Sequence, residues 1–267
     1  MHRALLALVL SCAASSLLVA TAAVAEPVGA LGFTAYASVA DPLGGFDYVR
    51  LFPGNVVISH MDHALLTGVF IGDDDSTEYA IDDTATLVKI DTASGVVTPV
   101  GFLPGFDEAA HISLTVDNDS GAALALVARS PCTASDLYSA DLTTGTTTLI
   151  TGFDACLQSM VFAPDGTLYA LDRDTGDLAA LTNGLVDIGA IGFTLDDADT
   201  LAFAPGGSNI LLLFAFNPDL ATNVLCTVDT STGFATLVGQ VGGDEPIAAV
   251  ALAAPLPETV FADGFDG

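Results

Sequence analysis

The chain has 267 residues, a formal net charge of −28 and a hydrophobic fraction of 51%. Thirty-three acidic residues stand against five lysines and arginines, so no basic patch is present to neutralise phosphate groups. This excludes nucleic acids and anionic membrane surfaces as partners, while the apolar content is sufficient for a folded core.

The first 25 residues are typical of a secretory signal peptide. His2 and Arg3 form a basic start, an apolar run follows, and Ala23 and Ala25 form a small-residue cleavage site. No second run of about 18 apolar residues follows, so we expect no transmembrane segment in the mature chain. The sequence therefore predicts an exported protein that resides in the periplasm, on the cell surface or in the medium.

A sequence motif with a central Asp-to-Gly turn recurs along the mature chain. It is LVKIDTASGVVTPVG at 87–101, LYSADLTTGTTTLITG at 137–152 and VLCTVDTSTGFATLVG at 224–239. The glycine supplies the positive φ that closes a short hairpin, and the aspartate can accept hydrogen bonds from the turn's own amides. The alternating flanks predict half-buried antiparallel strands. Residues 172–176 are interpreted as a degenerate or displaced copy of the turn.

A second sequence motif, rich in apolar residues, recurs between these hairpins. It aligns at spacings of 46, 46, 41 and 49 residues through Phe70, Val116, Phe162, Phe203 and Leu252. A period in the forties that consists only of strands is typical of the blades of a β-propeller.

The strands add up to five blades of four strands each. Four units run from about residue 64 to 241, and the fifth combines IAAVALA near the C-terminus with FTAYASVA, DYVRLFP and NVVISH near the N-terminus. The predicted fold is therefore an all-β propeller over residues 26–255, closed by strands from both ends of the chain. Six blades and a two-sheet sandwich are the alternatives, and the sandwich gives no reason for a steady period.

The repeats resemble those of secreted bacterial β-propeller families built on L-Y-x-I-D-x-x-T-G-x-x-T-x-V-G units. Most members of these families have no assigned activity, so the resemblance implies the fold and leaves the function open. Residues 256–267 are acidic with two phenylalanines, and we expect them to be a disordered tail. They resemble the V-F-x-D-G-F-E-like endings of many secreted proteins of some gammaproteobacteria, which implies a sorting or surface role.

The propeller topology places the three mature cysteines. Loops that enter an inner strand and loops that join second to third strands share one face, around the mouth of the central channel. Cys132 lies in a loop of the second kind and Cys156 in a loop of the first kind in the adjoining blade, so an oxidising compartment favours a disulfide between them. Cys226 falls within a strand and is expected to be a buried core residue.

The entry loops each carry at least one carboxylate, and all three mature histidines fall in two neighbouring ones. Imidazole and carboxylate groups are ligands that a divalent cation such as Ca²⁺, Zn²⁺ or Mn²⁺ accepts, although a solvated acidic surface explains the acids alone. The candidate metal ligands are His60, Asp62, His63, Asp107 and His111. Further acidic groups at 73–75, 117–119 and 172–177 are expected on the opposite face, as turn residues or fragments of calcium loops.

The leading functional hypothesis is a non-enzymatic, monomeric propeller that binds a protein or a small molecule on one loop face, tuned by a divalent cation. The alternative is a metal-assisted hydrolase or lactonase-like enzyme at the channel mouth, for which no catalytic pair stands out. A surface structural protein directed by the C-terminal tail is the third hypothesis.

Overall fold

The computed structural model describes residues 33–52, 55–72, 74–192, 194–195, 199–206, 208–217, 221–241 and 247–253. The predicted signal peptide and the C-terminal tail lie outside these ranges. Within them, no helical segment has the length and hydropathy needed to cross a bilayer.

The described residues form five four-stranded antiparallel sheets. Blade 1 comprises β4 (Leu65–Ile71), β5 (Asp74–Asp82), β6 (Thr86–Asp91) and β7 (Val97–Phe102). Blade 2 comprises β8 (Ala109–Asp117), β9 (Ala122–Arg129), β10 (Ser135–Ala140) and β11 (Thr147–Phe153). Blade 3 comprises β12 (Leu157–Phe162), β13 (Leu168–Asp172), β14 (Asp177–Leu181) and β15 (Leu185–Ala190). Blade 4 comprises β16 (Thr200–Phe203), β17 (Leu211–Asn217), β18 (Thr222–Val228) and β19 (Ala235–Gln240).

The remaining sheet, which we call the closing blade, has the strand order β20-β1-β2-β3. It joins β20 (Ile247–Ala253) to β1 (Thr34–Ala40), β2 (Phe46–Phe52) and β3 (Val56–Met61). β1 and β20 pair antiparallel from Thr34 opposite Ala253 to Val39 opposite Ile247. The prediction of a fifth blade made from both ends of the chain is confirmed.

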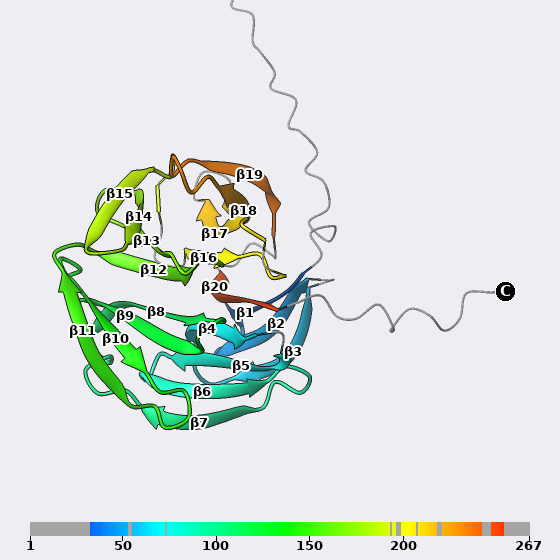
Figure 1. Ribbon diagram of the computed structural model, residues 1–267. Coiled ribbons are helices and arrows are strands. Elements are labelled where there is room, and N and C mark those ends of the chain that lie inside the picture. The colour runs from blue at the N-terminus through cyan, green and yellow to red at the C-terminus, as the bar shows by residue number, and fades with distance from the viewer. Residues whose placement is uncertain are drawn as a thin grey trace, which may run out of the picture.

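The five sheets surround a central axis (Figure 1), with β4, β8, β12, β16 and β20 innermost and β7, β11, β15, β19 and β3 at the rim. The protein is a five-bladed β-propeller. The six-bladed ring and the two-sheet sandwich are therefore excluded.

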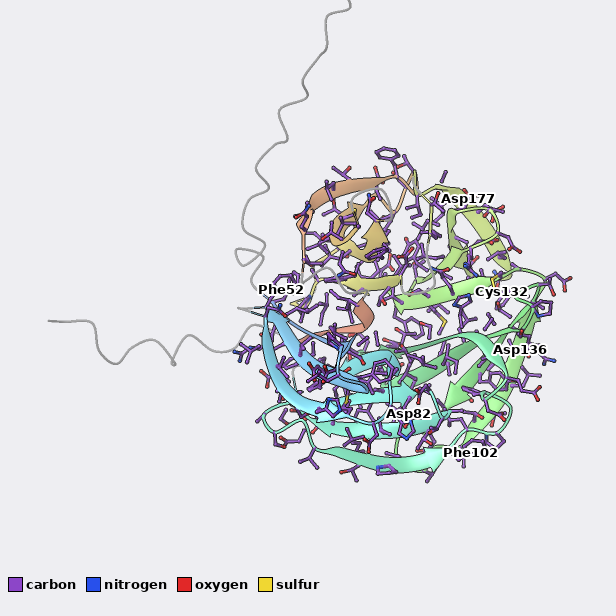
Figure 2. All side chains as sticks on the ribbon, turned by 180° about the vertical axis from the view of Figure 1, so that it is seen from behind. Phe52, Asp82, Phe102, Cys132, Asp136 and Asp177 are labelled. Carbon is purple, nitrogen blue, oxygen red and sulfur yellow. A yellow bond between two sulfur atoms is a disulfide. The ribbon has the colours of Figure 1, made fainter. Side chains whose placement is uncertain are left out.

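The apolar core lies between the blades, because each sheet has two faces to cover. Five clusters of buried side chains fill the five spaces between neighbouring sheets, one cluster to each space. Figure 2 shows side chains occupying these spaces. No blade can bury both faces alone, so the stability of each depends on its two neighbours.

The recurring Asp-to-Gly turn has the predicted hydrogen bonds and the predicted positive φ at glycine in all three copies. The aspartate Oδ1 accepts a backbone N–H at 2.8 Å in the pairs Ser94–Asp91, Thr143–Asp141 and Ser231–Asp229. Hydrogen bonds from the hydroxyls of the same serines and threonine, and from these N–H groups, hold the pKa of each aspartate below its usual range. The closing glycines have φ values of 68°, 72° and 79°.

Glycine also permits a close approach between blades, which the sequence did not reveal. A Cβ on Gly101 would lie 2.7 Å from the carbonyl oxygen of Thr144, and a Cβ on Gly145 would lie 2.9 Å from the Gly101 Cα. The hairpin tip of blade 2 thus rests directly on the outer strand of blade 1. Gly189 and Gly233 form the same kind of contact between blades 3 and 4.

The copy of the turn at 172–176 is displaced. It joins β13 to β14, the second and third strands of blade 3, whereas the other copies join third to fourth strands. Placing Asp172, Asp174 and Asp177 on the face opposite the entry loops is therefore wrong. Blade 3 differs because a short turn at 182–184 connects β14 to β15 and leaves the longer Asp-to-Gly turn one connection earlier.

Side-chain hydroxyls link β4 to β8, β8 to β12 and β12 to β16. One edge of an inner strand has no neighbouring strand, so its N–H groups need other acceptors. Three hydroxyl oxygens accept such N–H groups at 2.9 Å, in the pairs Leu114 to Thr67, Met160 to Ser113 and Leu201 to Ser159. These hydrogen bonds connect blades 1 to 4 around the channel.

Replacing Thr67 by valine should lower the free energy of unfolding by about 1–3 kcal/mol, because the Leu114 N–H would remain buried without its acceptor while the side-chain shape is kept. Urea denaturation measures the loss. The matched control is Ser139→Ala, which removes a hydroxyl at an exposed position and should cost less than about 0.5 kcal/mol. Equal losses in the two variants would contradict the role of the hydroxyl.

A buried carboxyl group lies between the closing blade and blade 1. Tyr48 Oη donates to Glu78 Oε2 at 2.6 Å, and Oε1 has no hydrogen-bond partner among the described residues. A Cβ on Gly68 would lie 2.0 Å from that Oε1, so the glycine makes room for the carboxyl group. Burial raises the pKa of Glu78 to about 7 and raises that of Tyr48 far above its usual value.

Candidate functional site

A cavity of about 270 Å³ opens at one end of the central channel. Its wall includes the first residues of the inner strands β8, β12 and β16, so it lies on the face of the entry loops. The polar part of its lining includes His111, Ser113, Gln158 and Asp199. The channel mouth, where the sequence predicts the site, therefore contains a cavity with both polar and apolar walls.

The polar side chains of this cavity come from three blades. Gln158 and Asp199 are each only 4% exposed, and Asp199 Oδ1 accepts the Phe216 N–H at 3.3 Å. His111 Nε2 lies 3.4 Å from Nη1 of Arg173. A guanidinium group can only donate, so this contact requires a lone pair on Nε2 and places the proton of a neutral imidazole on Nδ1.

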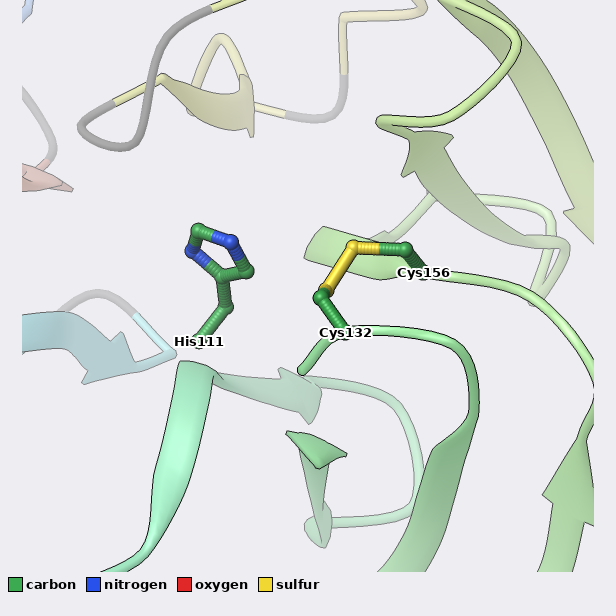
Figure 3. Close-up of side chains that lie close together, drawn as sticks. All are labelled: His111, Cys132 and Cys156. Carbon is green, nitrogen blue, oxygen red and sulfur yellow. A yellow bond between two sulfur atoms is a disulfide. The ribbon is translucent and has the colours of Figure 1, made fainter. Parts of the chain in front are cut away.

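The predicted disulfide between Cys132 and Cys156 is present. It connects the loop between β9 and β10 to the residue before β12, and so links blade 2 covalently to blade 3. Figure 3 shows the His111 ring beside it, and one ligand atom from each of the three residues lies within 4.8 Å of the others. Cys226 is buried in β18, as predicted, and burial raises its pKa to about 11.

His60 is at the end of β3, next to two carboxylates that are not among the predicted ligands. Its Nδ1 lies 3.3 Å from Asp41 Oδ2 and 3.3 Å from Asp47 Oδ1. Asp47 lies directly opposite His60 in the pairing of β2 with β3. That register was the signal that could have identified Asp47, because the two strands were both predicted from the sequence.

The other predicted ligands are distributed over the same face. His63 Nδ1 is 2.9 Å from Asp83 Oδ1, and His60, Asp62 and His63 border a separate cavity of about 260 Å³. Asp107 is exposed in the turn before β8 and borders neither cavity. The structure thus brings His60, Asp62 and His63 to one hollow and His111 to another.

The carboxylates of the other entry loops are only partly described. Asp199 lines the channel cavity, whereas Glu108 and Asp154 are exposed. Asp196, Asp197, Asp244 and Glu245 lie outside the described residues. In the part of the chain that is described, the groups of three potential metal ligands within 4.8 Å of one another are Asp41 with Asp47 and His60, and His111 with Cys132 and Cys156.

No protein-family model matches the chain, and no curated protein matches it significantly. Among solved structures, a chain in the crystal structure of a nidogen/laminin complex has a TM-score of 0.55 at 10% identity, covering 84% of this chain and 99% of that one. The similarity between these two chains concerns the fold alone. An oligogalacturonate lyase in complex with manganese (TM-score 0.44, 15% identity, 76% of this chain and 61% of that one) and a streptogramin B lyase (0.40, 12%, 80% and 70%) are less similar. At these low sequence identities, the similarity does not show that the proteins share a ligand or a reaction.

Proposed function

We propose that this protein is an exported binding module that holds a small neutral or cationic molecule in the cavity at the channel mouth. The observation that supports the proposal is the pair of almost fully buried polar side chains, Gln158 and Asp199, in the wall of an open cavity. A few polar groups in a concave, partly apolar wall are the usual features of a small-molecule site.

The volume of the cavity and the charged groups in its wall limit which molecules can bind there. At about 270 Å³ it is slightly smaller than the cavities of about 300–1,000 Å³ that hold drug-sized molecules. Asp199 is the acidic group among the described lining residues, and none of them is a lysine or an arginine. With a net charge of −28, the protein favours cations and disfavours anions at a channel mouth.

Thermal unfolding in the presence of three probes tests this proposal. We expect putrescine or glucose to raise the Tm of the wild-type protein, and succinate to leave it unchanged, because the cavity lining carries a negative charge. Gln158→Met should remove the shift, whereas Gln240→Met, at an exposed position in β19, should retain it. No shift with either favoured probe, or a shift with succinate alone, would contradict the proposal.

A divalent cation at Asp41, Asp47 and His60 is a second candidate function. Ligand atoms about 2.0–2.1 Å from a tetrahedral Zn²⁺ lie about 3.3 Å apart. The two distances from His60 Nδ1 to the carboxylate oxygens are both 3.3 Å. The imidazole favours Zn²⁺ over Ca²⁺, and the exposed position of His60 leaves room for a water ligand.

Isothermal titration with Zn²⁺ at pH 7.5 tests the cation site. Wild-type protein in its disulfide form should bind one Zn²⁺ here, and Asp47→Asn should lower the affinity at least about tenfold by removing a ligand charge. His63→Gln changes a neighbouring histidine outside the group and serves as the control. Unchanged binding by Asp47→Asn would exclude the site.

The hydrolase or lactonase alternative makes a separate prediction. Hydrolytic activity should disappear together with the metal on chelation. Activity that survives chelation would rule out metal assistance.

A further inference from the structure

The geometry points to a redox-dependent metal site at the channel mouth. When the disulfide is reduced, His111, Cys132 and Cys156 bind one Zn²⁺. This site is separate from the group around His60 and does not depend on what occupies the neighbouring cavity.

The three side chains already converge from different elements. His111 comes from β8, Cys132 from the loop between β9 and β10, and Cys156 from the residue before β12. Their ligand atoms lie within 4.8 Å of one another (Figure 3). On a tetrahedral Zn²⁺ two thiolate sulfurs lie about 3.8 Å apart and each lies about 3.5 Å from an imidazole nitrogen. After reduction, a small rotation of the two cysteine side chains would reach this arrangement.

Reduction supplies the ligand chemistry that the disulfide lacks. A dithiol reductant transfers two electrons and two protons to the Cys132–Cys156 disulfide and becomes a disulfide itself. Metal binding then releases the two thiol protons, since thiolates are the ligands of zinc. Two thiolates neutralise the charge of Zn²⁺, so the occupied site carries no net charge.

The absence of net charge on the zinc-bound site is important because the positively charged Arg173 lies beside His111. In the disulfide form, Nη1 of Arg173 is 3.4 Å from His111 Nε2 and so keeps an imidazole lone pair on that atom. Binding of zinc through Nε2 requires the guanidinium group to move away. Arg173 is exposed, so solvent can receive its charge.

The site would retain an open coordination position. Zinc sites with four protein ligands are structural, whereas sites with three keep a position for water or a ligand. His111 also lines the cavity of about 270 Å³, so the open position would face the channel mouth. Reduction therefore adds a Lewis-acidic centre to the cavity wall.

Cobalt absorption of the reduced protein tests the proposal, with Co²⁺ as the probe for zinc. After reduction with a phosphine under anaerobic conditions, one Co²⁺ per chain should produce a thiolate-to-metal charge-transfer band and intense tetrahedral d–d bands. The disulfide form should lack the charge-transfer band, because it has no thiolate at this site. A site without thiolates, such as the group around His60, gives no such charge-transfer band.

Four variants distinguish the residues that are proposed to bind the metal from residues that are not. Cys132→Ser should abolish the charge-transfer band, and His111→Ala should weaken Co²⁺ binding at least about tenfold. Arg173→Ala should strengthen binding, because it removes a competing cation. Cys226→Ala is the matched control and should leave the spectrum unchanged, since that thiol is buried in β18.

Circular dichroism and counting of reactive thiols establish that the reduced protein is folded. A folded, fully reduced protein that lacks the bands would overturn the proposal. So would bands that persist in Cys132→Ser, or unfolding of the chain on reduction.

Discussion

Glu78→Gln is expected to become more stable relative to the wild-type protein as the pH rises from about 4.5 to about 7, by on the order of 3 kcal/mol in total. Burial raises the pKa of Glu78 from 4.5 in the unfolded chain to about 7 in the folded one. Between these values the folded state holds a proton that the unfolded state has lost, so the stabilisation present below pH 4.5 disappears as the pH approaches 7. Each pKa unit corresponds to about 1.36 kcal/mol.

Urea denaturation of both proteins at several pH values from 4 to 8 measures this difference. The aspartates with lowered pKa, such as Asp91 and Asp141, lose stabilisation in acid equally in both proteins, so the difference isolates Glu78. Tyr48→Phe is the companion variant, because it removes the hydrogen bond to Oε2 and keeps the carboxyl group. A pH-independent difference between wild type and Glu78→Gln would show that Glu78 titrates normally.

Removing the disulfide is expected to lower the free energy of unfolding by about 3 kcal/mol. The cysteines are separated by 24 positions, and a cross-link that closes a loop of this length restricts the unfolded chain by about that amount. The double variant Cys132→Ala/Cys156→Ala measures the loss in urea. Because the bond joins blade 2 to blade 3, the variant should also open more readily between these blades.

Reduced wild-type protein is the control for this measurement. If the cross-link alone is responsible, reduction and the double substitution should destabilise the metal-free protein to the same extent. A double variant as stable as the oxidised wild type would mean that packing already holds the two loops together.

The fold was predictable because its signals are local and repeated. The turn at Asp91 to Gly95 contains its own hydrogen-bond partners, and its flanks alternate with the period of a strand. Repetition then gave the period, and the three strands near the N-terminus with the one near the C-terminus completed the ring. The disulfide between Cys132 and Cys156 followed from the topology, which placed their loops on one face, together with the oxidising compartment that the signal peptide implies.

The details of the candidate site were not predictable in the same way. His60 was expected to meet the other histidines, but its observed neighbours Asp41 and Asp47 depend on how β1, β2 and β3 align. Glu78 has the appearance of an ordinary charged residue in a strand, and only the packing of two blades buries it. Contacts between blades have no signature in a local pattern, so sequence periodicity cannot reveal them.

The pairing of β1 with β20 also determines when the molecule can finish folding. Three strands of the closing blade are synthesised first, and the fourth is synthesised after all the other blades. Until β20 arrives, the earlier strands present an unpaired edge, and the ring cannot complete its circle of contacts. Sequence-distant pairing of this kind is slow. During this delay a neighbouring chain could donate its own β20, so dilute conditions favour correct assembly.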